Sequence, residues 1–201
     1  MKEESVIYMS KTDYEYVKFM LNNYWVKNEE NSIKEGFPED ELATLWTSNP
    51  AKIYNPDKLF NITAVSDNSK FNIGPYEFTC ISTPGHTPGH MCLYMEKEKI
   101  LFSGDHVLFD ISPNITRWPT VKNSLKDYID SLHKIKKYEV KLALPAHRNN
   151  DMDLYHRIDE LINHHELRLE EVLEIVMANP GLNAYDIAGK MKWSLKNKIW
   201  R

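Results

Sequence analysis

The chain has 201 residues, of which 42% are hydrophobic, and its formal net charge is −4. This length suits one ordinary domain with a small appendage, and charge alone gives no reason to expect a nucleic-acid partner. No run approaches the roughly 18 apolar residues of a membrane helix, and the first residues lack the apolar centre of a signal peptide. Two cysteines without a CxxC pair favour a reducing compartment. We therefore expect a cytoplasmic protein without membrane association.

The first quarter of the chain is predicted to be mainly helical. Residues 5–9 form a short apolar run typical of a strand, and an amphipathic helix capped by Ser10 or Thr12 follows it. A second helix is expected to begin at Pro38, because proline favours the first helical position and acidic residues follow it. This helix ends near residues 48–50.

From about Asn61 the pattern changes to short apolar runs separated by turns, which predicts strands. The expected strands cover residues 61–67, 71–74, 77–83, 90–96 and 99–105. The expected later elements are a helix over 121–138, a strand over 140–144 and helices over 153–177 and 184–191. This order predicts a layered α/β (α+β) domain over residues 1–150 and a helical tail over 151–201.

Two histidines lie four residues apart in the stretch STPGHTPGH (82–90). The prolines between and before them exclude a helix, and an extended stretch of four residues spans about 13 Å. His86 and His90 therefore cannot easily share a metal ion, so we expect one ring to point into a site and the other to form hydrogen bonds. For an isolated histidine, a structural role is the more common alternative.

Three metal-binding residue types follow the ends of predicted strands. His86 follows one strand, Asp105 follows the sequence FSG, and His147 follows the sequence LPA. Imidazole and carboxylate groups suit zinc and related divalent ions. These residues are candidate metal ligands, although their long separations make a weak motif by spacing alone.

The segments TPGHTPGH, FSGD and PAH, in this order, resemble the metallo-β-lactamase superfamily, a group of αββα metallohydrolases that includes glyoxalase II. The resemblance covers about residues 5–195 and is most specific over 80–110 and 140–172. It implies two zinc ions, with His86 on the first, His147 on the second and Asp105 bridging both. It also implies that His90 is not a ligand.

The resemblance implies a metal-dependent hydrolase in which the dinuclear site activates water and Asp105 is the catalytic carboxylate. The implied substrate is a small molecule or a phosphodiester, with an ester, thioester, lactam or phosphodiester bond. The segment RIDELINHHELRLEEVL further resembles members that carry a winged-helix-like C-terminal tail. Here the tail resembles an incomplete winged helix.

The strongest motif of that superfamily, His-x-His-x-Asp-His, has no counterpart here, because no histidine precedes His86. The chain therefore resembles a member without the N-terminal strands, which predicts a partial αββα sandwich. Each metal ion would have two candidate protein ligands, so we expect weak or partial zinc binding. A complementing N-terminal segment or a second copy of the chain are the expected partners.

Other residues near the candidate ligands have two interpretations each. His90, His106 and Arg148 would contact a ligand residue or the substrate, whereas structural roles, or a surface ion pair for Arg148, are the alternatives. Trp118 would line the cleft or pack beneath a loop.

Two further functions remain open. A truncated or degenerate family member would have little catalysis and would act as a binding or interaction module. The basic, tryptophan-containing segment 184–201 would allow nucleic-acid binding, although a marginal amphipathic helix explains it equally well.

Overall fold

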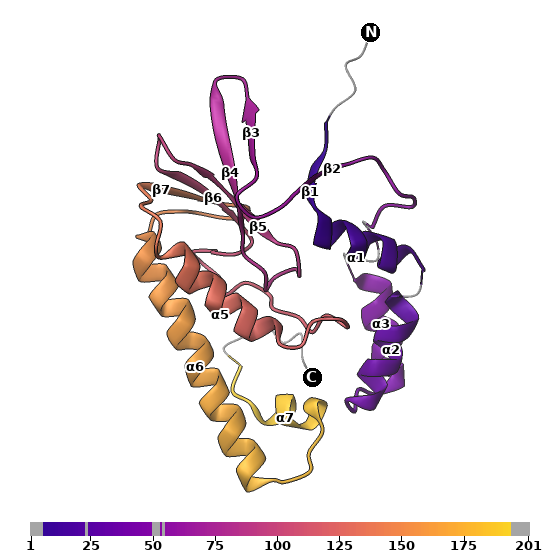
Figure 1. The fold of residues 1–201 in the computed structure, drawn as a ribbon. Coiled ribbons are helices and arrows are strands. Elements are labelled where there is room, and N and C mark those ends of the chain that lie inside the picture. The colour runs from indigo at the N-terminus through magenta and orange to yellow at the C-terminus, as the bar shows by residue number, and fades with distance from the viewer. Residues whose placement is uncertain (1–5, 23, 50–52, 54, 194–201) are drawn as a thin grey trace. The chain divides into compact units, whose positions relative to one another are not determined.

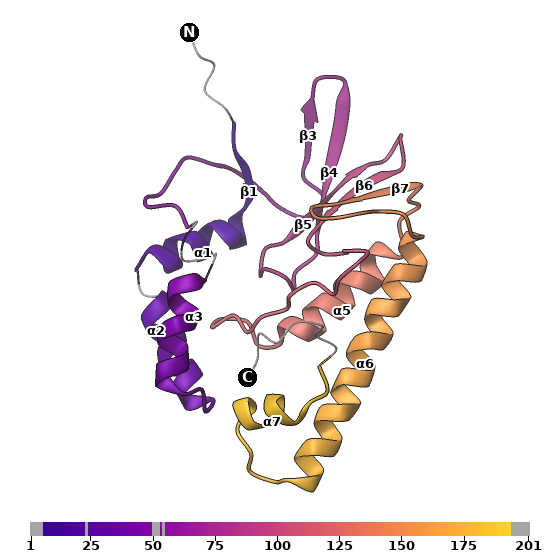
Figure 2. The ribbon, with the colours of Figure 1, turned by 180° about the vertical axis from the view of Figure 1, so that it is seen from behind.

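The computed structural model describes residues 6–22, 24–49, 53 and 55–193. The chain divides into two compact units (Figures 1 and 2). The sheet unit comprises Met1–Asn23 and Pro56–Ile162, and the helical unit comprises Tyr24–Asn55 and Asn163–Arg201. The predicted mixed α/β architecture with a helical C-terminal tail is confirmed. A domain boundary at residue 150 stays a prediction.

The sheet unit is built on a five-stranded sheet in the order β3-β4-β5-β6-β7. Its strands are β3 (Lys70–Ile73), β4 (Tyr76–Ser82), β5 (Met91–Met95), β6 (Ile100–Gly104) and β7 (Leu142–Pro145). Neighbours from β3 to β6 are antiparallel, whereas β7 runs parallel to β6. The connection between β6 and β7 contains α5 (Ser124–Ile135), as parallel neighbours require a crossover. The carboxyl ends of β6 and β7 therefore meet at one edge.

A separate parallel ladder pairs β1 (Tyr8–Ser10) with β2 (Thr63–Val65). Helix α1 (Lys11–Asn22) begins directly after β1. Its first turn is capped by Ser10, one of the two predicted caps, whose hydroxyl accepts a hydrogen bond from the Asp13 amide at 3.0 Å. Each strand predicted from the sequence thus has a counterpart among β1–β7.

One face of the five-stranded sheet packs against α5 and the first part of α6 (Leu154–Ala178) (Figure 1). Alternate strand residues point to this face, as the period of two in a strand requires. The core contains Ile81, Cys92, Tyr94 and Leu101 from strands and Tyr128, Leu132, Ile135, Ile158 and Leu161 from helices. Burying each large apolar side chain stabilises the fold by about 1.5–3 kcal/mol.

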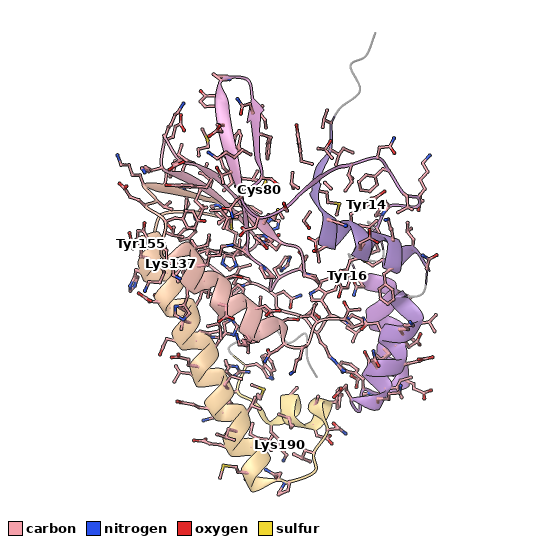
Figure 3. All side chains as sticks on the ribbon, viewed as in Figure 1. Tyr14, Tyr16, Cys80, Lys137, Tyr155 and Lys190 are labelled. Carbon is pink, nitrogen blue, oxygen red and sulfur yellow. The ribbon has the colours of Figure 1, made fainter. Side chains whose placement is uncertain are left out.

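Both cysteines are free and buried in this unit, as expected without a disulfide scaffold (Figure 3 labels Cys80). Burial raises the pKa of Cys92 to about 12, because the thiolate would lose its hydration. Its sulfur lies 3.5 Å from the Ser103 carbonyl oxygen. Cys92 is therefore an inert thiol in the native fold.

The opposite face of the sheet carries a row of aromatic rings. Tyr8 stacks on Phe71 with ring centres 4.4 Å apart, and Phe71 stacks on Phe78 at 5.5 Å. Phe78 in turn lies 5.9 Å from Phe102, which is 37% exposed. Leu142 on β7 is 42% exposed. This outer face therefore leaves apolar side chains partly open to solvent.

The helical unit contains α2 (Tyr24–Lys34), α3 (Glu39–Ser48), the later part of α6, and α7 (Ala184–Lys190). Helix α3 begins one residue after Pro38, close to the predicted start. No helix in the described ranges is long and apolar enough to cross a membrane. Most of the basic residues in the predicted nucleic-acid-binding tail lie in 194–201, outside the described residues.

Candidate metal centre

Three of the sequence-predicted site residues meet at the edge where β6 and β7 end. Asp105 follows β6, His147 follows β7, and His86 lies on the loop between β4 and β5. The His86 Nε2 atom lies 3.8 Å from Asp105 Oδ2, and the His147 Nε2 atom lies 3.3 Å from Asp105 Oδ1. Each carboxylate oxygen of Asp105 therefore faces a different imidazole.

The backbone of the parallel strands places Asp105 and His147 side by side. Gly104 lies opposite Pro145 in the ladder, and the Ala146 amide donates to the Gly104 carbonyl at 3.0 Å. Gly104 has a φ of 56°, a left-handed conformation that favours glycine. A Cβ atom there would lie 2.7 Å from His90 Nε2. The Gly-Asp step therefore needs glycine both for its turn and for the close packing of His90.

Main-chain contacts orient the His86 ring. Its Nδ1 atom lies 2.8 Å from the Asn114 carbonyl oxygen, which can only accept, so Nδ1 carries a proton. In the neutral ring the Nε2 lone pair then points toward the side of Asp105. The indole of Trp118 donates to the His86 carbonyl at 3.2 Å. A histidine hydrogen bond directed away from the site, such as that of Nδ1, is typical of metal-binding histidines.

Asp13 anchors the loop that carries His86. One carboxylate oxygen accepts from the Thr87 hydroxyl at 2.6 Å, and the other accepts from the Gly89 amide at 2.7 Å. Desolvation raises the pKa of Asp13, although these hydrogen bonds favour the ionised form. A Cβ at Gly89 would meet Ser10 Oγ at 2.2 Å, so this contact requires glycine. Asp13 could not be recognised from the sequence, because it resembles any acidic residue in the first turn of a helix.

His90 takes the hydrogen-bonding role expected for one of the paired histidines. Its Nδ1 atom lies 2.8 Å from Thr83 Oγ1, and burial lowers its pKa to about 4, so the ring is neutral near pH 7. The assumption of an extended stretch is wrong, because the chain turns between Gly85 and Gly89. The rings of His86 and His90 are consequently only 6.2 Å apart.

His106 and Arg148 lie in contrasting environments. His106 is fully buried, and its ring packs edge-on against Tyr128 with centres 5.2 Å apart. Desolvation lowers the pKa of His106 to about 3, so it is also neutral near pH 7. Arg148 is exposed and has a left-handed φ of 65° directly after His147. Whether any of these residues contacts a substrate stays a prediction.

The donors fit a metal centre in type and direction but are few in number. Asp105 faces one histidine on each side, which gives two protein donors to each potential ion position. Within the described ranges, no group of three or more His, Cys, Asp or Glu side chains is arranged to hold a metal ion. A catalytic zinc site usually has three protein ligands. Among the described residues, Asp105, His86 and His147 therefore offer fewer donors than a catalytic zinc site usually has.

A family model described as the metallo-beta-lactamase superfamily matches residues 11–147. Lactamase-like protein adaB of Aspergillus niger is 32% identical over 135 residues, which cover 66% of this chain and 40% of the relative. An atrochrysone carboxyl ACP thioesterase of Aspergillus fumigatus is 26% identical over 137 residues, or 68% and 39% of the two chains. The chain spans about two fifths of the length of these relatives.

Solved structures show a similar fold. A metallo-beta-lactamase family protein of Thermus thermophilus superposes with a TM-score of 0.78 at 23% identity, covering 92% of this chain and 60% of that one. A beta-lactamase domain protein of Burkholderia ambifaria gives a TM-score of 0.74 at 23% identity, covering 94% and 54%. At this identity the likeness concerns the fold alone.

Proposed function

The chain belongs to the metallo-β-lactamase superfamily, and we propose that it forms part of a zinc-dependent hydrolase with His86, Asp105 and His147 among its metal ligands. One observation carries this proposal: the two oxygens of one carboxylate face the Nε2 atoms of two different imidazoles. Two lone-pair donors that face each other repel unless a proton or a cation lies between them. The arrangement therefore favours a bridging role for Asp105.

Bound zinc would supply a water of pKa near 7 and a Lewis acid for the scissile group. The chain's own residues position the donors. The Asn114 carbonyl holds the proton on Nδ1 of His86 and leaves Nε2 as the donor. Asp13 holds the backbone on either side of the loop tip, and the neutral His90 adds no positive charge beside the ligands.

For the substrate we propose an ester or thioester ahead of a lactam or phosphodiester. One relative is named as a thioesterase, and this supports the thioester among the four bond types. The test is a hydrolysis assay with added zinc on an aryl ester, an acyl thioester, a β-lactam and a diaryl phosphate. Asp105→Asn should abolish any hydrolysis, whereas His156→Ala, which removes an exposed histidine on α6, should leave it unchanged.

Metal binding can be tested without activity. Cobalt(II) added to the full chain should give the absorption bands of a bound ion, with weak affinity because each position has two protein donors. His86→Ala and His147→Ala should each reduce the bound cobalt by about half, and Asp105→Asn should remove most of it. A chain that binds no cobalt or zinc would contradict the proposed centre.

We also propose a complementing polypeptide segment as the partner of the outer sheet face. Phe102 and Leu142 on this face are exposed, and burying apolar surface stabilises a complex by about 25 cal/mol per Å². The relatives also contain more sequence than this chain spans. A segment bearing further histidines should raise the melting temperature and the zinc content together when mixed with the chain. A second copy covering the face would instead appear as a dimer by analytical ultracentrifugation, with no gain in zinc.

An interaction module with little catalysis is the second candidate function. The small number of donors around each potential ion position, among the described residues, favours it. It predicts no hydrolysis above the Asp105→Asn background even when the chain is saturated with metal and its partner segment is present.

A further inference from the structure

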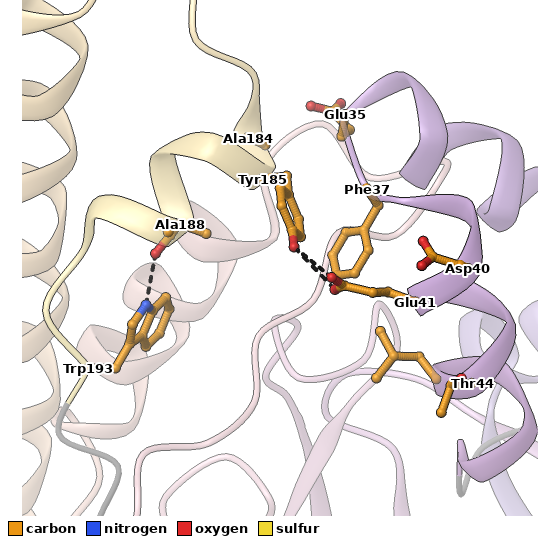
Figure 4. A pocket seen from close by; sticks show the side chains of 11 residues that line it. Glu35, Phe37, Asp40, Glu41, Thr44, Ala184, Tyr185, Ala188 and Trp193 are labelled. Carbon is orange, nitrogen blue, oxygen red and sulfur yellow. Dashed lines mark hydrogen bonds between the residues drawn. The ribbon is translucent and has the colours of Figure 1, made fainter. Parts of the chain in front are cut away.

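The helical unit contains a hollow of about 840 Å³ between the region around α3 and the region around α7 (Figure 4). Residues from both sides line it, and those that matter here are Glu35, Phe37, Asp40, Glu41, Tyr185 and Trp193. Its volume lies within the usual range of small-molecule sites, about 300–1,000 Å³. The residues of the candidate metal centre belong to the other unit, so the hollow needs its own explanation.

Aromatic rings form part of the lining. Phe37 and Tyr185 meet edge to face, with ring centres 4.8 Å apart. Trp193 is 57% exposed, yet its indole N–H is held by the Ala188 carbonyl at 2.8 Å. The guanidinium of Arg168 lies 4.6 Å from the centre of the Trp193 ring. The chain therefore already uses one of these rings to hold a cation.

Three acidic side chains also line the hollow. Glu35, Asp40 and Glu41 contribute carboxylates, and none of the described residues that line the hollow is basic. The Tyr185 hydroxyl donates to both oxygens of Glu41 at 3.1 Å, which keeps that carboxylate on the wall (Figure 4). Desolvation raises the pKa of Tyr185, and the charges of Glu41, Asp186 and Asp40 raise it further. The described lining thus contains three acidic side chains and no basic one.

Backbone and side-chain contacts join the two sides of the hollow. The Tyr185 amide donates to the Glu35 carbonyl at 3.1 Å. Gly36 has a φ of 91°, and a Cβ there would lie 2.3 Å from the Asn183 side chain. Asn183 in turn caps α7 by accepting from the Asp186 amide at 2.8 Å. A preformed site costs a ligand less ordering entropy.

We propose that this hollow binds an organic cation, an ammonium group carried on a small apolar body. The rings of Phe37, Tyr185 and Trp193 would contact the apolar body and the cation, and Asp40 and Glu41 would balance its charge. A bare metal ion does not suit this space, because the described residues hold no group of three metal-binding side chains. This site is independent of the proposed hydrolase.

The test compares two molecules of nearly the same shape on the full chain. Choline carries a trimethylammonium group, and 3,3-dimethyl-1-butanol replaces the charged nitrogen by carbon. Titration calorimetry should show choline binding at least about tenfold more tightly, because cation–π and carboxylate contacts require the charge. The Trp193 indole N–H signal in NMR spectra should shift on addition of choline and locate the site.

Matched variants distinguish the effect of acidic side chains that line the hollow from the effect of the helical unit's overall charge. Glu41→Gln and Asp40→Asn should each weaken choline binding at least about threefold, whereas Glu174→Gln, an exposed acid on α6 outside the lining, should not change it. If Glu41→Gln does not fold, Asp40→Asn decides. Equal affinity for choline and its neutral analogue, no binding of either, or equal loss in all three variants would each overturn the proposal.

Discussion

Two regions of the molecule hold the ligands of the candidate metal centre in different ways. The β6–β7 edge places Asp105 and His147 through the register of a parallel ladder, which depends on main-chain hydrogen bonds. The loop between β4 and β5 places His86 through contacts with distant parts of the chain. Ligands at strand ends are thus positioned by the fold, whereas a loop ligand depends on particular neighbouring groups.

Acidification should have the largest effect on the free energy of unfolding. It acts on His90, which packs between the two regions and is buried as a neutral ring. Its pKa is about 4 in the fold, against an ordinary value of 6.5 for histidine. The unfolded chain therefore binds a proton at a higher pH than the folded chain does. The contribution of His90 to the free energy of unfolding is fully present above about pH 6.5. It decreases by about 3 kcal/mol as the pH falls toward 4.

Urea unfolding of the metal-free chain between about pH 7 and pH 4 measures this loss. His106, with a pKa of about 3, adds a decrease of the same sign. His90→Gln should reduce the slope of stability against pH, even if it lowers the stability itself. An unchanged slope in this variant would show that His90 is not held neutral by the fold.

Gly104→Ala, at the β6–β7 edge, should lower the free energy of unfolding by about 2–3 kcal/mol. The substitution combines an unfavourable left-handed backbone with a Cβ atom 2.7 Å from His90 Nε2. Gly74→Ala is a matched control, because Gly74 has a φ of 57° but no atom within 4 Å of its added Cβ. The control should lose only about 1 kcal/mol. Equal losses in thermal unfolding would mean that the His90 contact adds nothing.

Asp13→Ala should weaken the loop region selectively, with a stability loss of about 2 kcal/mol. It leaves the Thr87 hydroxyl and the Gly89 amide without their acceptor. Cobalt affinity should fall about tenfold while the weaker binding that remains still depends on His147. Asp127→Ala, which removes an acid from the first turn of α5, should leave cobalt affinity unchanged. If both variants bind cobalt like the wild type, Asp13 does not position His86.

Trp118→Phe should have the smallest effect and lower the free energy of unfolding by about 1 kcal/mol. The ring contact with Tyr16 can persist, whereas the hydrogen bond from the indole to the His86 carbonyl is lost. Thermal unfolding measures the change. A loss as large as that of Asp13→Ala would show that the Trp118 contact, and not the Asp13 anchor, dominates the positioning of the loop.

The same contrast explains what could be predicted from the sequence. Apolar patterns predict the strands, and Asp105 and His147 could be brought together because both follow strand ends. Asp13 could not be linked to the loop, because it lies 74 residues before Thr87 and resembles any acid at a helix start. The Asn114 contact uses a backbone carbonyl, which leaves no signal in the residue type.

The hollow of the helical unit shows the same limit. Phe37 and Tyr185 are separated by most of the chain, and neither belongs to a recognisable motif. The sequence pattern likewise does not predict the sharp bend at Gly85–Gly89, since the two Pro-Gly pairs exclude a helix without specifying the turn. Side-chain contacts between distant segments require the tertiary structure.

The buried thiol of Cys92 allows transient opening of the fold to be measured by chemical labelling. An alkylating reagent reacts with thiolate, and a pKa of about 12 together with full burial leaves almost none available in the native state. Cys80 is buried as well, so labelling of either residue requires exposure of the sheet. The rate of alkylation, followed by mass spectrometry, would therefore count transient openings of the core in an unmodified protein, without any probe having been introduced.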